Sequence, residues 1–425
     1  MHEWRVPHAS RRVPGAPLHI LWIKTELLHP VTVGGRIRTF NMLRELRRRH
    51  HVTYLALDDG TGDPDAAERA SEYAHELIRI RVRPARRGSL RFAAGVAGSL
   101  LSPLPYVVWR ARSSALARAL EERVARGDID VVVCDFIFPS ENVPNGLRTP
   151  IVLFQHNVEA AIWRRHAEVR TNPLARAFFR AQWRRMHRFE AAQCRRFDQV
   201  IAVSEHDKKT MRDEYQASHV AAVPTGVDTD YFSPAPAAPR RPNSLVFTGA
   251  MDWLPNEDAM SYFVETILPI VHRELPDTHL TIVGRNPSAR VRALAEQHRG
   301  VTVTGSVPDV RPYLDAASAF IVPLRIGGGT RLKIFEALAM DLPVISTPVG
   351  AEGLDTVHGE TIVLAESATE FAAAVVQLLR NPAEGRALGC RGGEFVRSRF
   401  DWAPVADVFA DICASAVERH AAYTP

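Results

Sequence analysis

The chain has 425 residues, a length that accommodates two or three domains of roughly 100–200 residues each. Hydrophobic residues make up 46% and charged residues 24%, which is the mix of a globular protein and argues against a disordered chain. The net charge of +5 is uneven, because residues 1–200 carry +13 and the remainder carries −8. Charge alone leaves two explanations for the basic half: a surface for anionic lipid or a phosphorylated acceptor, or solvated arginine-rich helices. No helix-turn-helix signature, zinc spacing or aromatic RNA platform accompanies the charge, which argues against nucleic acid as a partner.

The cysteines and the N-terminal segment bear on the compartment. Four scattered cysteines, none paired at two-residue spacing, fit a reducing compartment and predict neither a zinc site nor a redox motif. The first 17 residues have no apolar core, so we expect a flexible tail rather than a secretory signal. The stretch from Phe92 to Trp109 has no charge, but its glycines and prolines favour a short helix followed by a loop over a membrane span. Docking of this stretch at a membrane interface stays open. Together these features predict a cytoplasmic protein, with peripheral contact with the inner membrane face as an open possibility.

The first half reads as alternating strands and helices. Leu18–Ile23 is a candidate buried strand, a Gly34-Gly35 loop follows, Ile37–Arg49 has a helical apolar face, and His51–Leu57 is the next strand. This order is the βαβ unit of a parallel sheet. Further strands are expected at Asp130–Cys134, Ile151–Phe154 and Gln199–Val203. A long helix is predicted from Arg176 to Phe197, with arginines at every fourth position on a face that we expect to be solvated.

The alternation restarts after a proline-rich linker at Ser233–Pro242. Strands are expected at Ser244–Phe247, Leu280–Val283, Val301–Thr304, Ala319–Val322 and Pro343–Ser346. A helical segment over Glu257–Leu275 is expected to break or kink at Pro269, and Leu332–Met340 is a further helix. The second half is thus a second doubly wound α/β domain. Ligands of open α/β sheets lie at the carboxyl ends of the strands, so both domains are expected to direct their loops at a shared cleft.

The segment between the strand at Ala319–Val322 and the next helix carries the strongest chemical signal. Three consecutive glycines, Gly327, Gly328 and Gly329, allow backbone N–H groups to approach a phosphate at the helix start. Arg331 and Lys333 follow in the first turn, where cations oppose the helix dipole unless an anion lies beside them. Glu336 is on the same side of the helix as Lys333 and can accept hydrogen bonds from two ribose hydroxyls. A glycine turn with a surface Lys–Glu pair is the simpler alternative.

The segment GGGTRLKIFEALAMDLPVISTPVGAEGL resembles the donor-binding region of the retaining GT-B glycosyltransferases of family four, also called glycosyl transferases group 1. Five other stretches resemble that family in the same order: VTVGGRIRTFNMLREL, FQHNVEAAIWRR, VIAVSEHDKKTM, VPTGVDTDYFSP and VFTGAMDWLPNEDAMSYF. The resemblance covers roughly residues 18–415. It implies GT-B architecture, an α/β fold of two Rossmann-like domains facing each other across a cleft. It also implies transfer of a sugar from a nucleotide diphosphate donor, with retention at the anomeric carbon and no metal or other cofactor.

The resemblance assigns roles by position. His156 would hydrogen-bond a hydroxyl of the donor sugar, and Glu336 would hold the ribose. Arg331 and Lys333, as substitutes for cations that the family carries elsewhere, would stabilise the departing nucleotide diphosphate. Contacts with the donor or acceptor would also come from a larger set of loop residues: Gly34, Gly35, Gly249, Gly305, Ser306, Val307, Gly327, Gly328, Gly329 and Thr330. The expected partners are a UDP- or GDP-sugar donor and a glycan, lipid-linked or small-molecule acceptor.

Two departures from the family pattern qualify these roles. Many members carry a pair of glutamates separated by seven residues, and here the first position is Gly328. Many also carry an Arg and a Lys after the first strand of the second domain, whereas the loop Gly249–Asn256 has neither, so Arg331 and Lys333 are the natural substitutes. Two other classes therefore remain open: a GT-B sugar-nucleotide epimerase, and a catalytically inactive glycosyltransferase-like binding subunit.

The expected domain organisation follows from these boundaries. Residues 1–17 are predicted to be a tail, 18–232 the acceptor-side domain, 233–242 the linker, and 243–400 the nucleotide-sugar domain. An amphipathic helix over 401–425 is expected to return and pack on the first domain.

Overall fold

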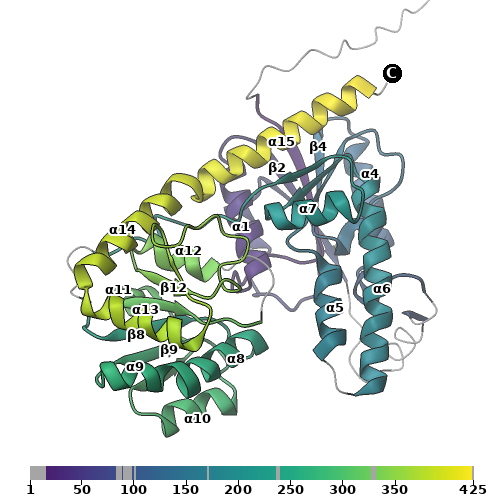
Figure 1. Cartoon of the computed structure of the whole chain (residues 1–425). Helices are drawn as coiled ribbons and strands as arrows, with labels where there is room; N and C mark the ends of the chain where they lie inside the picture. The colour runs from purple at the N-terminus through teal and green to yellow at the C-terminus, as the bar shows by residue number, and fades with distance from the viewer. Residues whose placement is uncertain are drawn as a thin grey trace, which may run out of the picture. The chain divides into compact units, whose positions relative to one another are not determined.

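A computed structural model describes residues 16–82, 89, 98–99, 102–169, 172–235, 240–326 and 332–423. The chain divides into two compact units (Figure 1). Unit 1 contains Met1–Pro224 and Val405–Pro425, and unit 2 contains Thr225–Pro404. Each unit is a parallel sheet with helices, so the two predicted Rossmann-like domains are confirmed.

Within its described residues, unit 1 has a seven-stranded sheet in the order β3-β2-β1-β4-β5-β6-β7. Its strands are β1 (His19–Lys24), β2 (His51–Asp58), β3 (Glu76–Arg81), β4 (Val131–Asp135), β5 (Ile151–Phe154), β6 (Gln199–Ala202) and β7 (Val220–Ala222). The central strands are buried along nearly their whole length, as expected for parallel strands that helices cover on both faces. The chain reverses its direction of winding between β1 and β4, which makes their carboxyl ends the switch point of this sheet.

Helices cover both faces of this sheet. They are α1 (Gly34–Leu46), η1 (Glu68–Glu72), α3 (Tyr106–Arg110), α4 (Ser114–Val124), η2 (Phe138–Asn142), α5 (Glu159–Val169), α6 (Pro173–Arg196) and α7 (Glu205–Asp213). Helices α5 and α6 lie side by side as a long hairpin (Figure 1). The helix α15 (Trp402–Tyr423) contributes its residues from Val405 onward to this unit. Its Phe409 ring lies 5.5 Å from the Trp22 ring and 5.1 Å from the Phe154 ring, centroid to centroid.

The described part of unit 2 contains a six-stranded parallel sheet in the order β10-β9-β8-β11-β12-β13. Its strands are β8 (Ser244–Thr248), β9 (His279–Val283), β10 (Val301–Gly305), β11 (Ala319–Val322), β12 (Val344–Ser346) and β13 (Val363–Leu364). The helices are α8 (Leu254–Tyr262), η3 (Phe263–Ile267), α9 (Leu268–Glu274), α10 (Ala289–Gln297), α11 (Arg311–Ala316), α12 (Leu332–Ala339), α13 (Ala368–Arg380) and α14 (Pro382–Arg399). The switch point of this sheet lies between β8 and β11.

The helical segment around Pro269 shows how the chain accommodates a proline. Residues Phe263–Ile267 form a π-helical turn, and α9 begins at Leu268 with Pro269 in its first turn. Proline has no backbone N–H to donate to a carbonyl in the preceding turn of an α-helix. The π-helical turn Phe263–Ile267 lies directly before the position where Pro269 removes that hydrogen bond. The helical segment therefore does not break at this proline; it continues from Leu254 to Glu274 and changes to a π-helical turn just before it.

The boundary between the units differs from the predicted linker. The units divide between Pro224 and Thr225, ahead of the proline-rich segment 233–242, of which residues 236–239 lie outside the described structure. The reason lies in backbone and side-chain hydrogen bonds with Phe400 and Asp401, the two residues that precede α15. Val227 N donates to Phe400 O at 2.7 Å, and Thr229 Oγ1 donates to Asp401 at 2.8 Å. These bonds attach residues 225–232 to unit 2.

Candidate functional site

Asp135 is the centre of a buried polar network at the switch point of unit 1. Its carboxylate is fully buried at the last position of β4, and Lys24 ends the neighbouring strand β1. Lys24 Nζ lies 2.9 Å from Oδ2 of Asp135 and donates to Thr39 Oγ1 at 3.0 Å. The same Oδ2 accepts from Thr39 Oγ1 at 2.7 Å and from Trp22 Nε1 at 2.8 Å. Buried charge is tolerated only where it is paired in this way, so the network fixes the ends of both strands.

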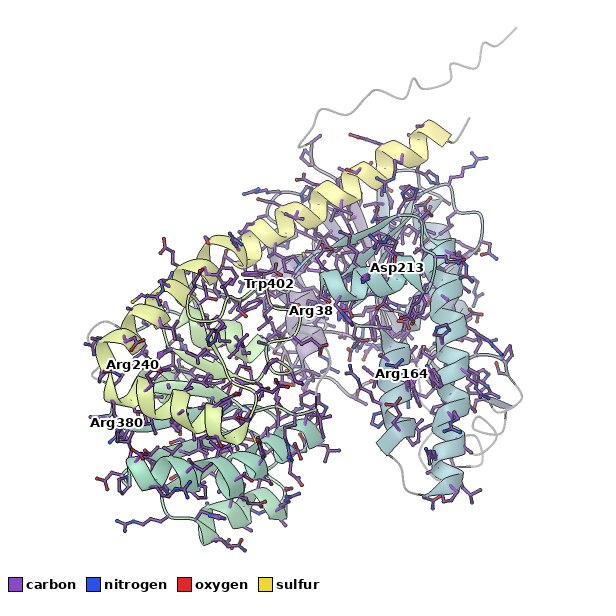
Figure 2. The ribbon with its side chains drawn as sticks, viewed as in Figure 1. Arg38, Arg164, Asp213, Arg240, Arg380 and Trp402 are labelled. Carbon is purple, nitrogen blue, oxygen red and sulfur yellow. The ribbon has the colours of Figure 1, made fainter. Side chains whose placement is uncertain are left out.

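His156, predicted to contact the donor sugar, belongs to this network. It lies two residues beyond the end of β5, is 8% exposed, and places Nε2 2.8 Å from Oδ1 of Asp135. Its carbonyl oxygen accepts from Arg38 Nη1 at 3.2 Å; Arg38, on α1, is labelled in Figure 2. Two neighbours therefore fix this residue: Asp135 at the ring and Arg38 at the backbone.

Electrostatics decide the protonation of His156. Burial lowers its pKa to about 4, an effect that Asp135 opposes and that Lys24 and Arg38 reinforce. Burial also lowers the pKa of Arg38 to about 10, while Lys24 and His156 hold the pKa of Asp135 well below its usual range. The imidazole is thus neutral near pH 7. Because Nε2 lies 2.8 Å from a carboxylate oxygen, we assign the proton of the neutral ring to Nε2, which leaves Nδ1 as an acceptor.

Gly34 and Gly35 begin α1 beside the Nδ1 side of this ring. A Cβ at Gly35 would lie 3.6 Å from Nδ1 of His156, an ordinary contact, and a Cβ at Gly34 would meet nothing within 4 Å. Packing therefore does not require glycine at either position. Val33 at the N-cap forms no side-chain cap, and the first turn carries no acidic residue. The helix start thus combines open space with a favourable position for negative charge.

Lys333 lies at the switch point of unit 2, between the ends of β8 and β11. It lies in the first turn of α12, and its Nζ donates to Asn256 Oδ1 at 2.9 Å and lies 4.0 Å from the centroid of the Phe247 ring at the end of β8. A Cβ at Gly249 would lie 2.7 Å from both Lys333 Nζ and Asn256 Nδ2, so a larger residue there would displace at least one of these groups. Gly249 was predicted to contact the donor; its first role in the structure is to make room for Lys333.

Glu336 lies one turn beyond Lys333 on α12. Burial raises its pKa to about 7, and the charge of Lys333 acts in the opposite direction. An added positive or hydrogen-bonding group would therefore shift its ionisation further toward the carboxylate.

The predicted base-contacting residues follow β10, two strands from β8. Gly305 ends β10 in the left-handed region with φ +74°, which favours glycine. Ser306 is exposed and Val307 packs against the core of the unit. Neighbouring strands are about 4.8 Å apart, so this loop lies roughly 10 Å across the sheet from the end of β8. That separation suits a ligand with a phosphate at one end and a base at the other.

Five predicted residues, Gly327, Gly328, Gly329, Thr330 and Arg331, lie outside the described part of the chain. Beside them, Arg325 is engaged elsewhere: its Nη2 and Nε donate to Asp258 at 2.6 and 3.1 Å, and it stacks over the Tyr262 ring. Within the described part of unit 2, Lys333 is therefore the cation that lies at the switch point. Among the described residues, no group of three or more His, Cys, Asp or Glu is placed to hold a metal ion.

Sequence reasoning missed the partners of these residues. The predicted strands stopped at Ile23 and Cys134, one residue before Lys24 and Asp135, yet a charge directly after a buried apolar run was a signal that was available. Asn256 and Thr39 carry no such signal, because each is one polar residue on a helix.

Comparison with known proteins agrees with the two-domain fold. Residues 33–231 match the family model described as Glycosyltransferase Family 4, and residues 242–381 match the one described as Glycosyl transferases group 1. The sucrose-phosphate synthase structure from Thermosynechococcus elongatus superposes with a TM-score of 0.66 at 18% identity, covering 95% of this chain and 100% of that one. The Anabaena HepE structure in complex with UDP and glucose gives a TM-score of 0.63 at 14% identity, covering 94% and 100%. Two doubly wound domains with these matches define a protein of the GT-B class.

Curated sequences give a further match. A GDP-mannose-dependent alpha-(1-6)-phosphatidylinositol monomannoside mannosyltransferase from Mycobacterium tuberculosis is 30% identical over 237 residues, 50% of this chain and 61% of the relative. The matched segments span between 42% and 61% of the length of such curated relatives. The two family models, matched in order, make the chain similar to glycosyltransferases in both of its units. None of the helices in its described part combines the length and apolar character that a membrane crossing requires.

Proposed function

We propose that this protein is a retaining glycosyltransferase of family four that transfers a sugar from a UDP- or GDP-sugar without a metal ion. Support for the donor class comes from the relatives, one named for GDP-mannose and one crystallised with UDP and glucose. The observation that carries the proposal is the fixed position of Lys333 at the switch point of unit 2, beside the start of α12.

Lys333 is suited to the leaving group. When the bond from the sugar to the diphosphate breaks, negative charge grows on the nucleotide diphosphate, and a cation already held in place stabilises it without reorganisation. Asn256 and the Phe247 ring hold Nζ before any ligand arrives. We assign Arg331 the same role, together with backbone N–H groups of the glycine run 327–329, on the basis of sequence alone.

Glu336 is assigned to the ribose. A carboxylate accepts from two hydroxyl groups at once, and only its ionised form does so with both oxygens. Because burial raises its pKa to about 7, nucleotide binding near neutral pH is expected to favour the ionised form. Gly305, Ser306 and Val307 would contact the base, largely through the backbone.

His156 is assigned to the transferred sugar. Its neutral ring offers Nδ1 as an acceptor on the side of Gly35, and a sugar hydroxyl is a donor of the matching kind. This residue would position the sugar and would not touch the nucleotide. Loss of its ring is therefore expected to lower turnover while leaving the affinity for free nucleoside diphosphate unchanged.

We propose a lipid-linked or glycan acceptor, with peripheral contact between α6 and an anionic membrane face. Seven arginines and one acidic residue, the buried Glu190, lie on α6. One face is exposed and basic, and next to it Leu174 is 83% and Phe178 42% exposed. The exposed arginines of that face, the basic face of α6, are Arg176, Arg180, Arg184 and Arg188.

The described residues of the uncharged stretch 92–109 form hydrogen bonds with α6. Arg185 Nη1 donates to Ser99 O at 3.1 Å, and Tyr106 N donates to Gln182 Oε1 at 2.9 Å. Arg164, labelled in Figure 2, adds a further exposed cation on α5, although Glu168 pairs with it. Apolar and basic groups on one hairpin are the combination that binds a membrane interface.

A binding screen tests the donor assignment first. A ligand that binds only the folded state raises its stability, by about 2.7 kcal/mol at one hundred times its dissociation constant. We expect UDP or GDP to raise the melting temperature and ADP or TDP to do so less. Release of the nucleoside diphosphate from the matching sugar nucleotide, followed with EDTA present, then separates a transferase from an inactive binding subunit. Recovery of an epimerised free sugar would favour an epimerase instead.

A further inference from the structure

Glu190, on α6, presents a carboxylate that the proposed function does not yet use. The side chain is fully buried, and each of its two oxygens accepts two hydrogen bonds. Oε1 accepts from Gln155 Nε2 and from Glu159 N, each at 2.9 Å. Oε2 accepts from Ala160 N at 3.0 Å and from Tyr215 Oη at 2.9 Å. All four donors are neutral groups.

Three of these donors belong to one short segment. Gln155 follows the last residue of β5, and Glu159 and Ala160 open α5. The first N–H groups of a helix have no partner within the helix, so a carboxylate from another helix here acts as its cap. Glu190 thus ties the end of β5 to the start of α5 and fixes both ends of the segment between them.

His156 lies inside that segment, one residue after Gln155. Its ring is directed by Asp135 and its carbonyl by Arg38, but neither contact fixes the backbone on the side toward α5. We infer that Glu190 is a positioning residue for His156, setting the path of residues 155–160 so that the ring meets Asp135 with Nδ1 available. This inference rests on the role proposed for His156 in transfer.

The surroundings of Glu190 show why a carboxylate is needed. Burial raises its pKa to about 7, while the two backbone N–H groups and Tyr215 act to lower it. The charged groups that face it are the Glu159 carboxyl, whose pKa burial and Glu190 also raise to about 7, and Asp207 of α7. An amide at this position would place its NH2 group against Glu159 N–H if it replaced Oε1, or against Ala160 N–H if it replaced Oε2, so in either orientation a donor of the segment would lose its acceptor.

The test compares Glu190→Gln with Tyr215→Phe in the full chain. Both remove hydrogen bonds from the same carboxylate site, but Tyr215 is not part of the segment that carries His156. The first readout is the pair of imidazole 15N chemical shifts of His156, assigned by their absence in His156→Ala. We expect Glu190→Gln to shift these signals and Tyr215→Phe to leave them in place. Unchanged signals in Glu190→Gln would overturn the inference whatever the activity.

The second readout is turnover of the donor. We expect Glu190→Gln to lower kcat ten- to a hundredfold with unchanged affinity for the nucleoside diphosphate, and Tyr215→Phe to lower it less than threefold. In the His156→Ala background, Glu190→Gln should have little further effect, because it acts through His156. An equal loss in both backgrounds would show a general structural role and contradict the inference.

Two provisions keep the outcomes distinct. If Glu190→Gln does not fold, Gln155→Met removes one tether of the same segment and should shift the same His156 signals by a smaller amount. If His156→Ala keeps full turnover while Glu190→Gln shifts the His156 signals, the proposed role of His156 in transfer is wrong. The inference that Glu190 positions the His156 ring is then still supported.

Discussion

Replacing Asp135 with asparagine should destabilise unit 1 strongly. The substitution keeps the shape of the side chain but removes the negative charge that faces Lys24 at 2.9 Å, and Lys24 is only 5% exposed. Breaking a buried ion pair by removing one partner costs about 3–5 kcal/mol, because the other charge stays buried and uncompensated. At about 2–4 °C per kcal/mol for a unit of this size, the melting temperature should fall by about 6–20 °C.

Differential scanning calorimetry is the suitable assay, since a two-unit chain need not unfold in one step. The transition of unit 1 should move, and the gain in stability that nucleoside diphosphate gives unit 2 should persist. The control is the double variant Lys24→Met with Asp135→Asn, which removes both charges. It should be more stable than Asp135→Asn alone. A shift below about 2 °C in the single variant, or a double variant that loses more than the single one, would refute this account of the network.

Four further predictions follow from particular contacts. Folding lowers the pKa of His156 from 6.5 to about 4, so the unfolded chain binds more protons than the folded chain between these pH values. The free energy of unfolding should therefore fall by a few kcal/mol as the pH drops through this window. Urea titrations should show that the free energy of unfolding of His156→Gln depends less on pH. Sugar nucleotides are diesters without a group titrating near pH 7, so their affinity should rise between pH 6 and 8 through ionisation of Glu336 and stay flat in Glu336→Gln. Gly249→Ala should displace Lys333 and lower turnover at least tenfold, whereas Gly34→Ala, which meets no atom within 4 Å, should leave the melting temperature unchanged; a turnover of Gly249→Ala equal to wild type would contradict the close contact. Replacing the four arginines of the basic face of α6 by glutamines should weaken binding to anionic vesicles at low salt by about three orders of magnitude, since each arginine contributes about 1 kcal/mol. The loss, measured by sedimentation, should exceed that from the matched removal of four exposed arginines elsewhere in unit 1: Arg48, Arg81, Arg118 and Arg126.

Buried strands were the part of the fold that sequence predicted best. β5 and β11 lie where their apolar runs were read, because uninterrupted burial on both faces leaves a continuous run of hydrophobic residues. Edge strands such as β3 and β7 were missed, since part-exposed positions dilute that pattern. Helix starts were also less visible: α1 begins at Gly34, three residues before its first apolar position.

The site residues that the sequence predicts are those that a local motif marks. Lys333 and Glu336 lie in one helix turn after a glycine run, and His156 follows a short buried strand. Their partners come from distant parts of the chain: Asn256 meets Lys333 across 77 positions, and Glu190 meets Gln155 across 35. Such pairings depend on how the strands are ordered in the sheet, which periodicity in a single sequence does not specify.

The central claim is that a fixed cation, and not a metal ion, stabilises the departing nucleoside diphosphate. Its most direct test is the rate at which Lys333→Ala releases nucleoside diphosphate from the sugar nucleotide found in the binding screen, with EDTA present throughout. We predict that the wild-type protein stays active and that Lys333→Ala, and likewise Arg331→Ala, lowers turnover ten- to a thousandfold, on the order of 1.4–4 kcal/mol of transition-state stabilisation. Full turnover in the Lys333 variant, or activity that EDTA abolishes and manganese restores, would contradict the claim.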